Sequence, residues 1–224
     1  MRVLVACEES QRVCIAFREK GHKAYSCDII ECSGGHPEWH IKGDCLPLLN
    51  GYKKFQTQDG KWHIIPKKWD MIIAHPPCTY LTVTGNGWFN IEKYGEKAVI
   101  REKEREKAVE FFMEFVNAKC NKIAIENPVG IMSTKWKKPT QIIQPYMFGE
   151  FMEKKTCLWL KNIPNLKPTN IVNPPERIKF ESGKTMPAWY AKLWSLPAEE
   201  RAALRSKTPW GVARAMAEQW GEEI

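Results

Sequence analysis

The chain has 224 residues, of which 43% are hydrophobic and 27% charged, and its formal net charge at pH 7 is +8. These proportions are typical of a globular protein, and no apolar run approaches the roughly 18 residues that a membrane span needs. The eight cysteines lie in a long, core-rich chain whose start has no secretory layout. We therefore expect reduced thiols and a cytoplasmic location. The basic charge fits a polyanionic partner, although a solvated basic surface explains it about as often.

The first 28 residues predict half of a nucleotide-type site. An apolar strand over residues 2–6 leads into a polar loop over residues 7–11, and an amphipathic helix follows and ends at Gly21. A second strand over residues 23–27 ends in Asp28. The helix N-terminus can face an anionic or polar ligand group, and the acid can accept hydrogen bonds from ribose hydroxyls. The loop lacks the GxGxxG glycines, which disfavours a pyrophosphate cradle and leaves the adenosyl group of S-adenosylmethionine as an alternative.

The segment that follows offers two local motifs. Gly43-Asp44 precedes a short LPLL segment, so Asp44 is either a second acid at the same crevice or the N-cap of a helix. We do not expect a zinc site in this region, because its first cysteine belongs to a core-facing strand. Four residues nevertheless have spacing that superficially resembles such a site: Cys27, Cys32, His36 and His40.

Two later predicted strands are each followed by a side chain that could take part in chemistry. The apolar run of residues 71–74 is stopped by two prolines, and Cys78 then lies on the loop. By itself this is equally well explained as a turn with an unreactive cysteine. The run of residues 122–125 is followed by Glu126 and Asn127. Because the carboxyl ends of parallel strands meet at one edge of a sheet, a thiol and a carboxylate there indicate a reactive crevice.

Composition and periodicity assign the other segments. The polar, glycine-containing stretch 79–94 has the composition of a mobile active-site loop, and a helix over 96–117 is expected to have a solvated charged first half. A hairpin over residues 52–68 carries lysines that either are simply exposed or contact nucleic acid, namely Lys53, Lys54, Lys61, Lys67 and Lys68. Further elements are expected as a strand over 154–161, irregular segments over 130–151 and 162–189, and helices over 197–204 and 209–220.

The order and spacing of these pieces resemble the DNA cytosine-5 methyltransferase family. VACEESQ (residues 5–11) with Asp28 resembles the family's first motif and its ribose-binding acid, and Gly43-Asp44 stands where the family has the acid that contacts adenine. The helix over residues 210–220 is similar to the last motif, which returns to the cofactor pocket. The resemblance implies S-adenosyl-L-methionine as cofactor, bound by Ala6, Cys7, Glu8, Ser10, Asp28, Ile29, Asp44 and Pro76.

The same resemblance implies a covalent mechanism. HPPCTYLTVTG (residues 75–85) looks like the family's proline-cysteine loop, with Pro77 preceding the nucleophile Cys78, and residues 125–127 look like its Glu-Asn motif. A thiolate that adds to carbon 6 of cytosine makes carbon 5 nucleophilic toward a sulfonium methyl group. Glu126 would then hold or protonate ring nitrogen N3, which requires a raised pKa. Asn127 would orient either the thiol loop or the base, and a base in a duplex would be flipped out.

The sequence also departs from the family pattern. Its first motif has Glu8, Ser10 and Gln11 where glycines are usual, and the arginine-bearing strand motif is not visible. Lys154, Lys155 and Thr156 lie where an equivalent substrate-binding group is expected. Only residues 161–205 are available where the family inserts a large target-recognition region, whereas specific protein–DNA interfaces bury on the order of 1,000 Å² or more of protein surface. We therefore expect low specificity, a very short target, a protein partner that supplies recognition, or a smaller substrate.

The sequence thus predicts a doubly wound, mostly parallel α/β sheet of the Rossmann-like methyltransferase type. We expect a catalytic domain over residues 1–160, a small irregular target-recognition segment over 161–205, and a C-terminal helical region over 206–224. The leading interpretation is a cytosine-5 methyltransferase that acts on duplex or single-stranded DNA. One alternative is the same chemistry on a free pyrimidine nucleotide, with a phosphate clamp made by Arg12 or by Lys154 and Lys155. Another is a catalytically silent relative that binds nucleic acid or a host protein. Exocyclic-amine methylation is disfavoured because it needs no thiol.

Overall fold

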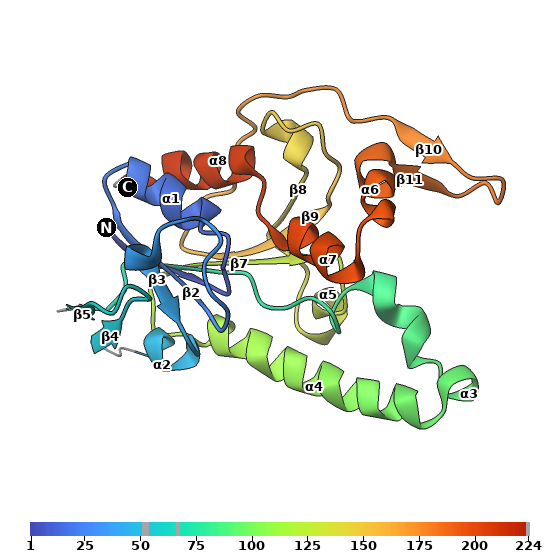
Figure 1. Cartoon of the computed structure of the whole chain (residues 1–224), viewed down its shortest axis with the longest axis horizontal. Helices are drawn as coiled ribbons and strands as arrows, with labels where there is room; N and C mark the ends of the chain where they lie inside the picture. Colours follow the sequence, from blue (N-terminus) through green and yellow to red (C-terminus); the bar gives the residue numbers. More distant parts are fainter. Residues whose placement is uncertain (51–53, 66–67, 223–224) are drawn as a thin grey trace.

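The computed structural model describes residues 1–50, 54–65 and 68–222, which form an α/β fold around one seven-stranded sheet (Figure 1). The strand order is β3-β2-β1-β6-β7-β9-β8. The first five strands of this order are mutually parallel, and β9 runs antiparallel to both of its neighbours. The prediction of a doubly wound, mostly parallel sheet is therefore confirmed. The sheet strands are β1 (Arg2–Ala6), β2 (Lys23–Asp28), β3 (His40–Lys42), β6 (Met71–Ala74), β7 (Lys122–Pro128), β8 (Gln141–Ile143) and β9 (Thr156–Lys161).

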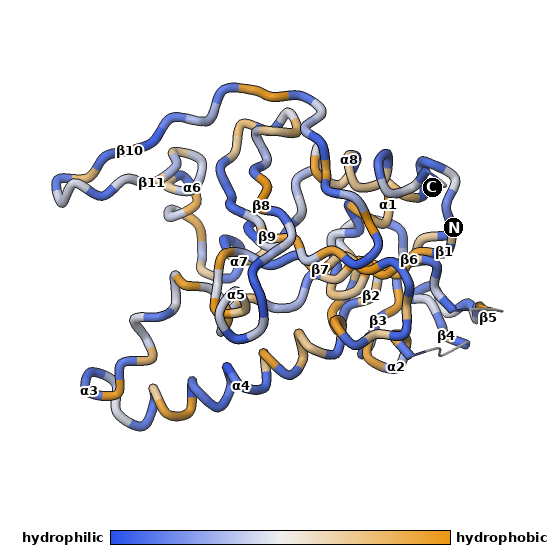
Figure 2. The backbone as a smooth tube through the Cα atoms, turned by 180° about the vertical axis from the view of Figure 1, so that it is seen from behind, coloured by the Kyte–Doolittle hydropathy of each residue, from blue (hydrophilic) through white to orange (hydrophobic). Residues whose placement is uncertain are grey.

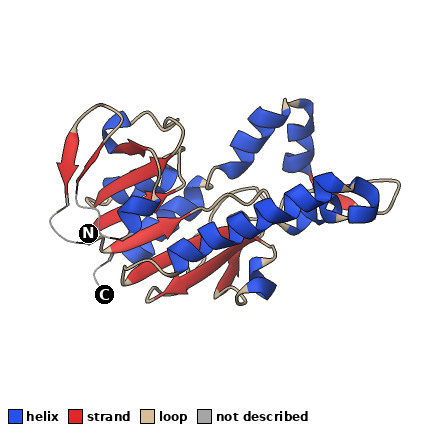
Figure 3. Cartoon of the chain, turned by 90° about the horizontal axis from the view of Figure 1, so that it is seen from below, coloured by secondary structure: helices blue, strands red, loops and turns tan. Residues whose placement is uncertain are grey.

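Helices cover both faces of the sheet, because the central strands are apolar on both sides. In β1, Val3 and Val5 pack with α1 (Arg12–Glu19) and α8 (Trp210–Gly221). Leu4 and Ala6, which alternate with these valines, pack on the opposite face with the helix α4 (Glu96–Val116). Figure 3 shows α4 lying across the strands on that second face. Two hydrophobic layers thus fix the sheet, with β1 and β6 at its centre.

The strand order reverses between β1 and β6. From β1 the chain builds outward through β2 and β3, and from β6 it builds in the other direction through β7. In open α/β sheets such a switch point leaves a crevice at the carboxyl ends of the strands, where ligands bind. The residues that follow β1, β2, β6 and β7 are therefore brought to one edge.

Smaller elements decorate this frame. Two separate two-stranded sheets are formed by β4 (Lys54–Gln56) with β5 (Trp62–Ile64), and by β10 (Arg177–Lys179) with β11 (Thr185–Pro187). The β4–β5 hairpin and α3 lie at opposite ends of the molecule (Figure 2). The short helices are α2 (Leu46–Leu49), α3 (Ile91–Tyr94), α5 (Met132–Lys135), α6 (Ala188–Lys192), α7 (Ala198–Ser206), η1 (Pro37–Trp39), η2 (Val83–Phe89), η3 (Pro145–Met147) and η4 (Leu193–Ser195).

Most expected elements are present, and several irregular stretches have more structure than predicted. The hairpin expected over residues 52–68 is confirmed as β4 and β5, although Lys53 and Lys67 lie outside the described residues. The stretch 79–94 is not simply a loop, because it contains η2 and α3, and residues 130–151 contain α5, β8 and η3. Within the described part of the chain, no helix has the length and apolar character to cross a membrane.

Candidate active site at the carboxyl edge of the sheet

Cys78 lies directly beyond the carboxyl end of β6, on a tight turn. The preceding Pro76 is buried, and the carbonyl of Cys78 accepts hydrogen bonds from the backbone N–H groups of Leu81 and Thr82, both at 3.0 Å. Prolines fix the backbone before the thiol, and the turn fixes it afterwards. The thiol is therefore presented by a defined backbone, as the sequence predicted.

Asn127 ties this turn to the neighbouring strand β7. It is buried, and its Nδ2 donates a hydrogen bond of 2.7 Å to the carbonyl oxygen of Pro76. Its Oδ1 is also buried and has no hydrogen-bond partner among the described residues. Of the two roles considered from the sequence, the contact favours support of the thiol loop over contact with a base.

Glu126 is paired with a histidine that the sequence reasoning did not select. The Nδ1 atom of His75 lies 3.0 Å from Oε2 of Glu126, and the two side chains are only 9% and 13% exposed. Burial by itself would raise the pKa of Glu126, but the His75 hydrogen bond, the charge of Lys154 and the Thr156 hydroxyl outweigh it and lower the pKa. Our expectation of a raised pKa is therefore wrong, and Glu126 is an ionised hydrogen-bond acceptor.

Cys78 is a neutral thiol in the same electrostatic environment. Burial raises its pKa most strongly, the negative charge of Glu126 raises it further, and the charges of Lys154 and Arg205 oppose the rise. A neutral thiol is a poorer nucleophile than a thiolate, so Cys78 is only weakly nucleophilic in this environment.

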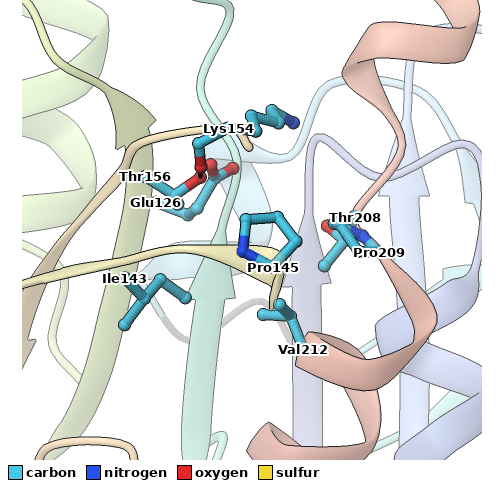
Figure 4. A pocket seen from close by; sticks show the side chains of 8 residues that line it. All are labelled: Glu126, Ile143, Pro145, Lys154, Thr156, Thr208, Pro209 and Val212. Atoms are coloured by element: carbon cyan, nitrogen blue, oxygen red, sulfur yellow. Dashed lines mark hydrogen bonds between the residues drawn. The ribbon is translucent and has the colours of Figure 1, made fainter. Parts of the chain in front are cut away.

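A small pocket joins Glu126 to the start of α8 (Figure 4). Glu126 and Thr156, from the neighbouring strands β7 and β9, have their oxygen atoms toward one another, and Lys154 lies above them. Thr208 and Pro209, which precede α8, close the opposite wall. Of the three candidate substrate-binding residues, Lys154 and Thr156 line this pocket beside Glu126. Lys155 is exposed and does not line this pocket.

The segment after Cys78 is held from two sides. The backbone N–H of Ile131 donates to the carbonyl of Leu81 at 2.8 Å, which fastens the segment to the chain that follows β7. From α4, Arg105 donates to the carbonyl of Tyr80 at 3.2 Å, and Arg101 donates to the carbonyl of Thr79 at 3.3 Å. The expectation that the charged half of α4 is only a solvated face is wrong at these two arginines.

The loop after β1 adopts a glycine-like backbone without glycine. Cys7 and Gln11 both have φ of 58°, in the left-handed region that non-glycine residues rarely adopt. The carboxylate of Glu8 is buried and accepts hydrogen bonds from the N–H groups of Val13 at 2.7 Å and Cys14 at 3.2 Å. The Glu8 side chain thus occupies these two N–H groups at the N-terminus of α1. The expectation that these amides face a ligand is therefore wrong, and Glu8 is engaged in capping the helix.

The next part of the edge has the groups that an adenosyl moiety requires. Asp28 ends β2 and is half-buried, and burial is the main cause that raises its pKa. Ile29 follows with 75% of its surface exposed, as an apolar platform for a planar ring. Asp44 is exposed after β3, and its Oδ1 accepts the N–H of Leu46 at 2.9 Å, which leaves its other oxygen available. These residues fit the adenosyl part of S-adenosylmethionine, whereas the Val13 and Cys14 amides of α1 are already occupied by Glu8.

The remaining predicted cofactor residues lie at the same edge. Ala6 is the last residue of β1, its carbonyl accepts the N–H of His75, and the N–H of Glu8 donates to the carbonyl of Cys27. Cys7 directly follows Ala6, and Pro76 directly follows His75. Ser10 lies two residues before the start of α1. Of the four residues with zinc-like spacing, His40 is hydrogen-bonded to Ser26 and to the carbonyl of Ile30. No metal-binding group of three or more side chains occurs among the described residues.

Comparisons with known proteins find similarity among solved structures. No protein-family model and no curated protein matches the sequence. Among solved structures, the chain is similar to a protein encoded within an E. coli prophage and proposed to be a DNA modification methyltransferase. The two share 12% sequence identity, the match covers 92% of this chain and 69% of the other, and the TM-score is 0.42. At this level of similarity, activity has to be inferred from the site itself.

Three residues of the site had no signal strong enough to select them in the sequence. His75 is one of five histidines in the chain, and in the sequence only its place between a predicted strand and the Pro-Pro-Cys residues distinguishes it. Thr208 and Arg205 come from the far end of the chain. The fold places Arg205 of α7 beside Lys154 and near Cys78, and it places Thr208, before α8, in the pocket with Glu126. The Pro-Pro-Cys context was the one available hint for His75.

Proposed function

We propose that this protein is an S-adenosylmethionine-dependent methyltransferase that methylates carbon 5 of cytosine in DNA through a covalent cysteine adduct. The observation that carries the proposal is the meeting of a thiol loop and an ionised carboxylate on the adjacent parallel strands β6 and β7. The adenosyl-compatible residues Asp28 and Ile29 lie at the same edge of the sheet.

The chain's own groups account for the activation of the base. Addition of Cys78 forms a bond from Sγ to carbon 6, and the ring electrons move toward N3, which takes up a proton. The thiol loses one proton while N3 gains one, so the net charge of the site is unchanged. Glu126 accepts hydrogen bonds from the protonated N3 and the adjacent amine, and so stabilises the adduct. This is a binding role, in place of the proton donation expected from the sequence.

The later steps restore the ring. When bound, the cofactor supplies an electrophilic sulfonium methyl group to carbon 5. Water would take the carbon 5 proton as the Cys78 sulfur leaves, and transfer of the N3 proton to that sulfur would regenerate the neutral aromatic base and the free thiol. Asp28 would hold the ribose of the cofactor, Ile29 would cover its adenine, and Asp44 would accept from the adenine amine.

DNA is favoured as the substrate by exposed aromatic side chains on the projecting segments. Trp88 in η2 is 57% exposed and Trp194 in η4 is 59% exposed, and Arg201 lies over the ring of Trp194. Exposed aromatic and cationic side chains can stack on bases and contact phosphates. A free nucleotide would use neither tryptophan.

The test is transfer of tritium from labelled S-adenosylmethionine to duplex DNA, single-stranded DNA and dCMP. We expect label in DNA, loss of label in Cys78→Ser, and no effect of Cys32→Ser, a second partly exposed cysteine. An oligonucleotide with 5-fluorocytosine should form a stable adduct with the wild-type protein, because fluorine cannot leave as a proton does. Label only in dCMP would establish a nucleotide enzyme, and absence of label from all three would favour a silent binding protein.

A further inference from the structure

His75 is the side chain of the thiol segment that the proposed reaction leaves unused. It follows β6, its backbone N–H donates to the carbonyl of Ala6 at 2.9 Å, and its ring is almost fully buried. Nδ1 lies 3.0 Å from Oε2 of Glu126. A carboxylate can only accept, so Nδ1 carries a proton and donates it to Glu126.

A purely structural role does not explain this ring. Nε2 of His75 is buried and has no hydrogen-bond partner among the described residues. A buried polar atom without a partner is unfavourable, and an apolar side chain would fill the same space without that penalty. The loop itself is already held by Asn127, which donates to the carbonyl of Pro76. The side-chain contact that distinguishes His75 is its hydrogen bond with Glu126.

We infer that His75 is a positioning residue that acts through Glu126. Its Nδ1–H occupies one carboxylate oxygen and leaves the other to receive N–H groups of the target base. This inference deepens the proposed function and rests on it for the identity of the base. A carboxylate held in this way selects a ring that presents donors beside N3, and it repels one that presents a carbonyl there.

The charges around Glu126 define what loss of His75 would do. Lys154 and Thr156 face the carboxylate from β9 and its approach, and Cys78 faces it from the thiol loop. On the β1 side, burial raises the pKa of Glu8, and the charge of His75 opposes that rise. Without His75, burial of Glu126 is less well compensated, so the carboxylate takes up a proton more readily.

The coupling can be measured without any methyl transfer, through the pH dependence of Cys78 alkylation by iodoacetamide, followed by mass spectrometry. In His75→Leu, Glu126 stays ionised in the alkaline range where Cys78 titrates, and its charge is no longer offset by the Nδ1–H donor, so the alkylation curve should move to higher pH and alkylation at neutral pH should be several-fold slower. His75→Asn should restore the wild-type curve, because an asparagine amide nitrogen occupies the Nδ1 position. His36→Leu is the matched control, since His36 makes a 3.0 Å pair with Glu38 that is exposed to solvent.

A cooperative thermal unfolding transition shows that a variant is folded. The alkylation curves of His75→Leu and His75→Asn can then be compared directly. Coinciding curves for wild type, His75→Leu and His75→Asn would overturn the inference, and so would a His75→Asn curve that follows His75→Leu. Once a DNA substrate that the protein methylates is known, His75→Leu should lower kcat/KM for that substrate on the order of 10- to 100-fold at neutral pH. Because alkylation requires no catalysis, failure of the proposed function and failure of the His75 inference give different results.

Discussion

Replacement of Asn127 by alanine tests whether this residue supports the thiol loop. The change removes the 2.7 Å hydrogen bond from Nδ2 to the carbonyl of Pro76, which lies in a buried part of the turn. A buried carbonyl left without a partner costs about 1–3 kcal/mol of folding free energy. For a chain of this size, that corresponds to a fall in Tm of roughly 2–12 °C.

The kinetic effect should fall on the chemical step. The thiol direction depends on Pro76 and Pro77, so a released turn should lower kcat about 10- to 100-fold while KM for DNA changes little. The assays are thermal unfolding and steady-state methylation at about 25 °C.

Gln141→Ala is the matched control. Its amide also holds a backbone segment, by donating to the carbonyl of Leu166 and accepting the N–H of the same residue at 2.8 Å each. It should lower stability by a similar amount and leave kcat unchanged. A rise in KM for DNA with unchanged kcat in Asn127→Ala would refute our reasoning, because it would place Asn127 against the base.

Three further changes probe the frame around the site. Gly130→Ala would place a Cβ 2.1 Å from the carbonyl oxygen of Leu81, so we expect a loss of roughly 1–3 kcal/mol in urea unfolding, and wild-type stability would contradict the contact. Asp28→Ala should weaken cofactor binding in calorimetry, whereas unchanged affinity would mean that the adenosyl site is elsewhere. Arg2 lowers the pKa of Asp70 by direct hydrogen bonding, so Arg2→Met should lose up to about 1 kcal/mol at neutral pH. That difference should vanish as pH falls through the folded-state pKa of Asp70, and a pH-independent loss would contradict the pairing.

The thiol and the carboxylate were predictable because their positions follow from local rules. Apolar β-branched runs predict β6 and β7, and the residue after a buried strand necessarily lies at a strand end. Two prolines and a glutamate that follow such runs are visible without any knowledge of neighbours. Cys78 and Glu126 were selected on this basis, and the structure brings their loops together at one edge.

The details that decide the chemistry depended on contacts between distant residues. The pKa of Glu126 was predicted to rise because burial alone was considered, whereas His75 and Lys154 reverse the direction. Glu8 was expected to face a ligand, but its side chain turns onto the α1 amides five and six residues later. Lys154 and Lys155 were indistinguishable in sequence, and only Lys154 lines the pocket.

The sequence by itself determined the strands, the long helix and the candidate site residues at strand ends, because hydrophobic periodicity and breaker residues act over a few positions. The tertiary structure alone decided which side chains share one environment. Strand order placed β6 beside both β1 and β7, and the return of α8 brought Thr208 and Pro209 to the pocket wall. Hydrogen-bond partners and charges act through space over a few ångströms, so the ionisation of Glu126 and the support of Cys78 are properties of the folded chain.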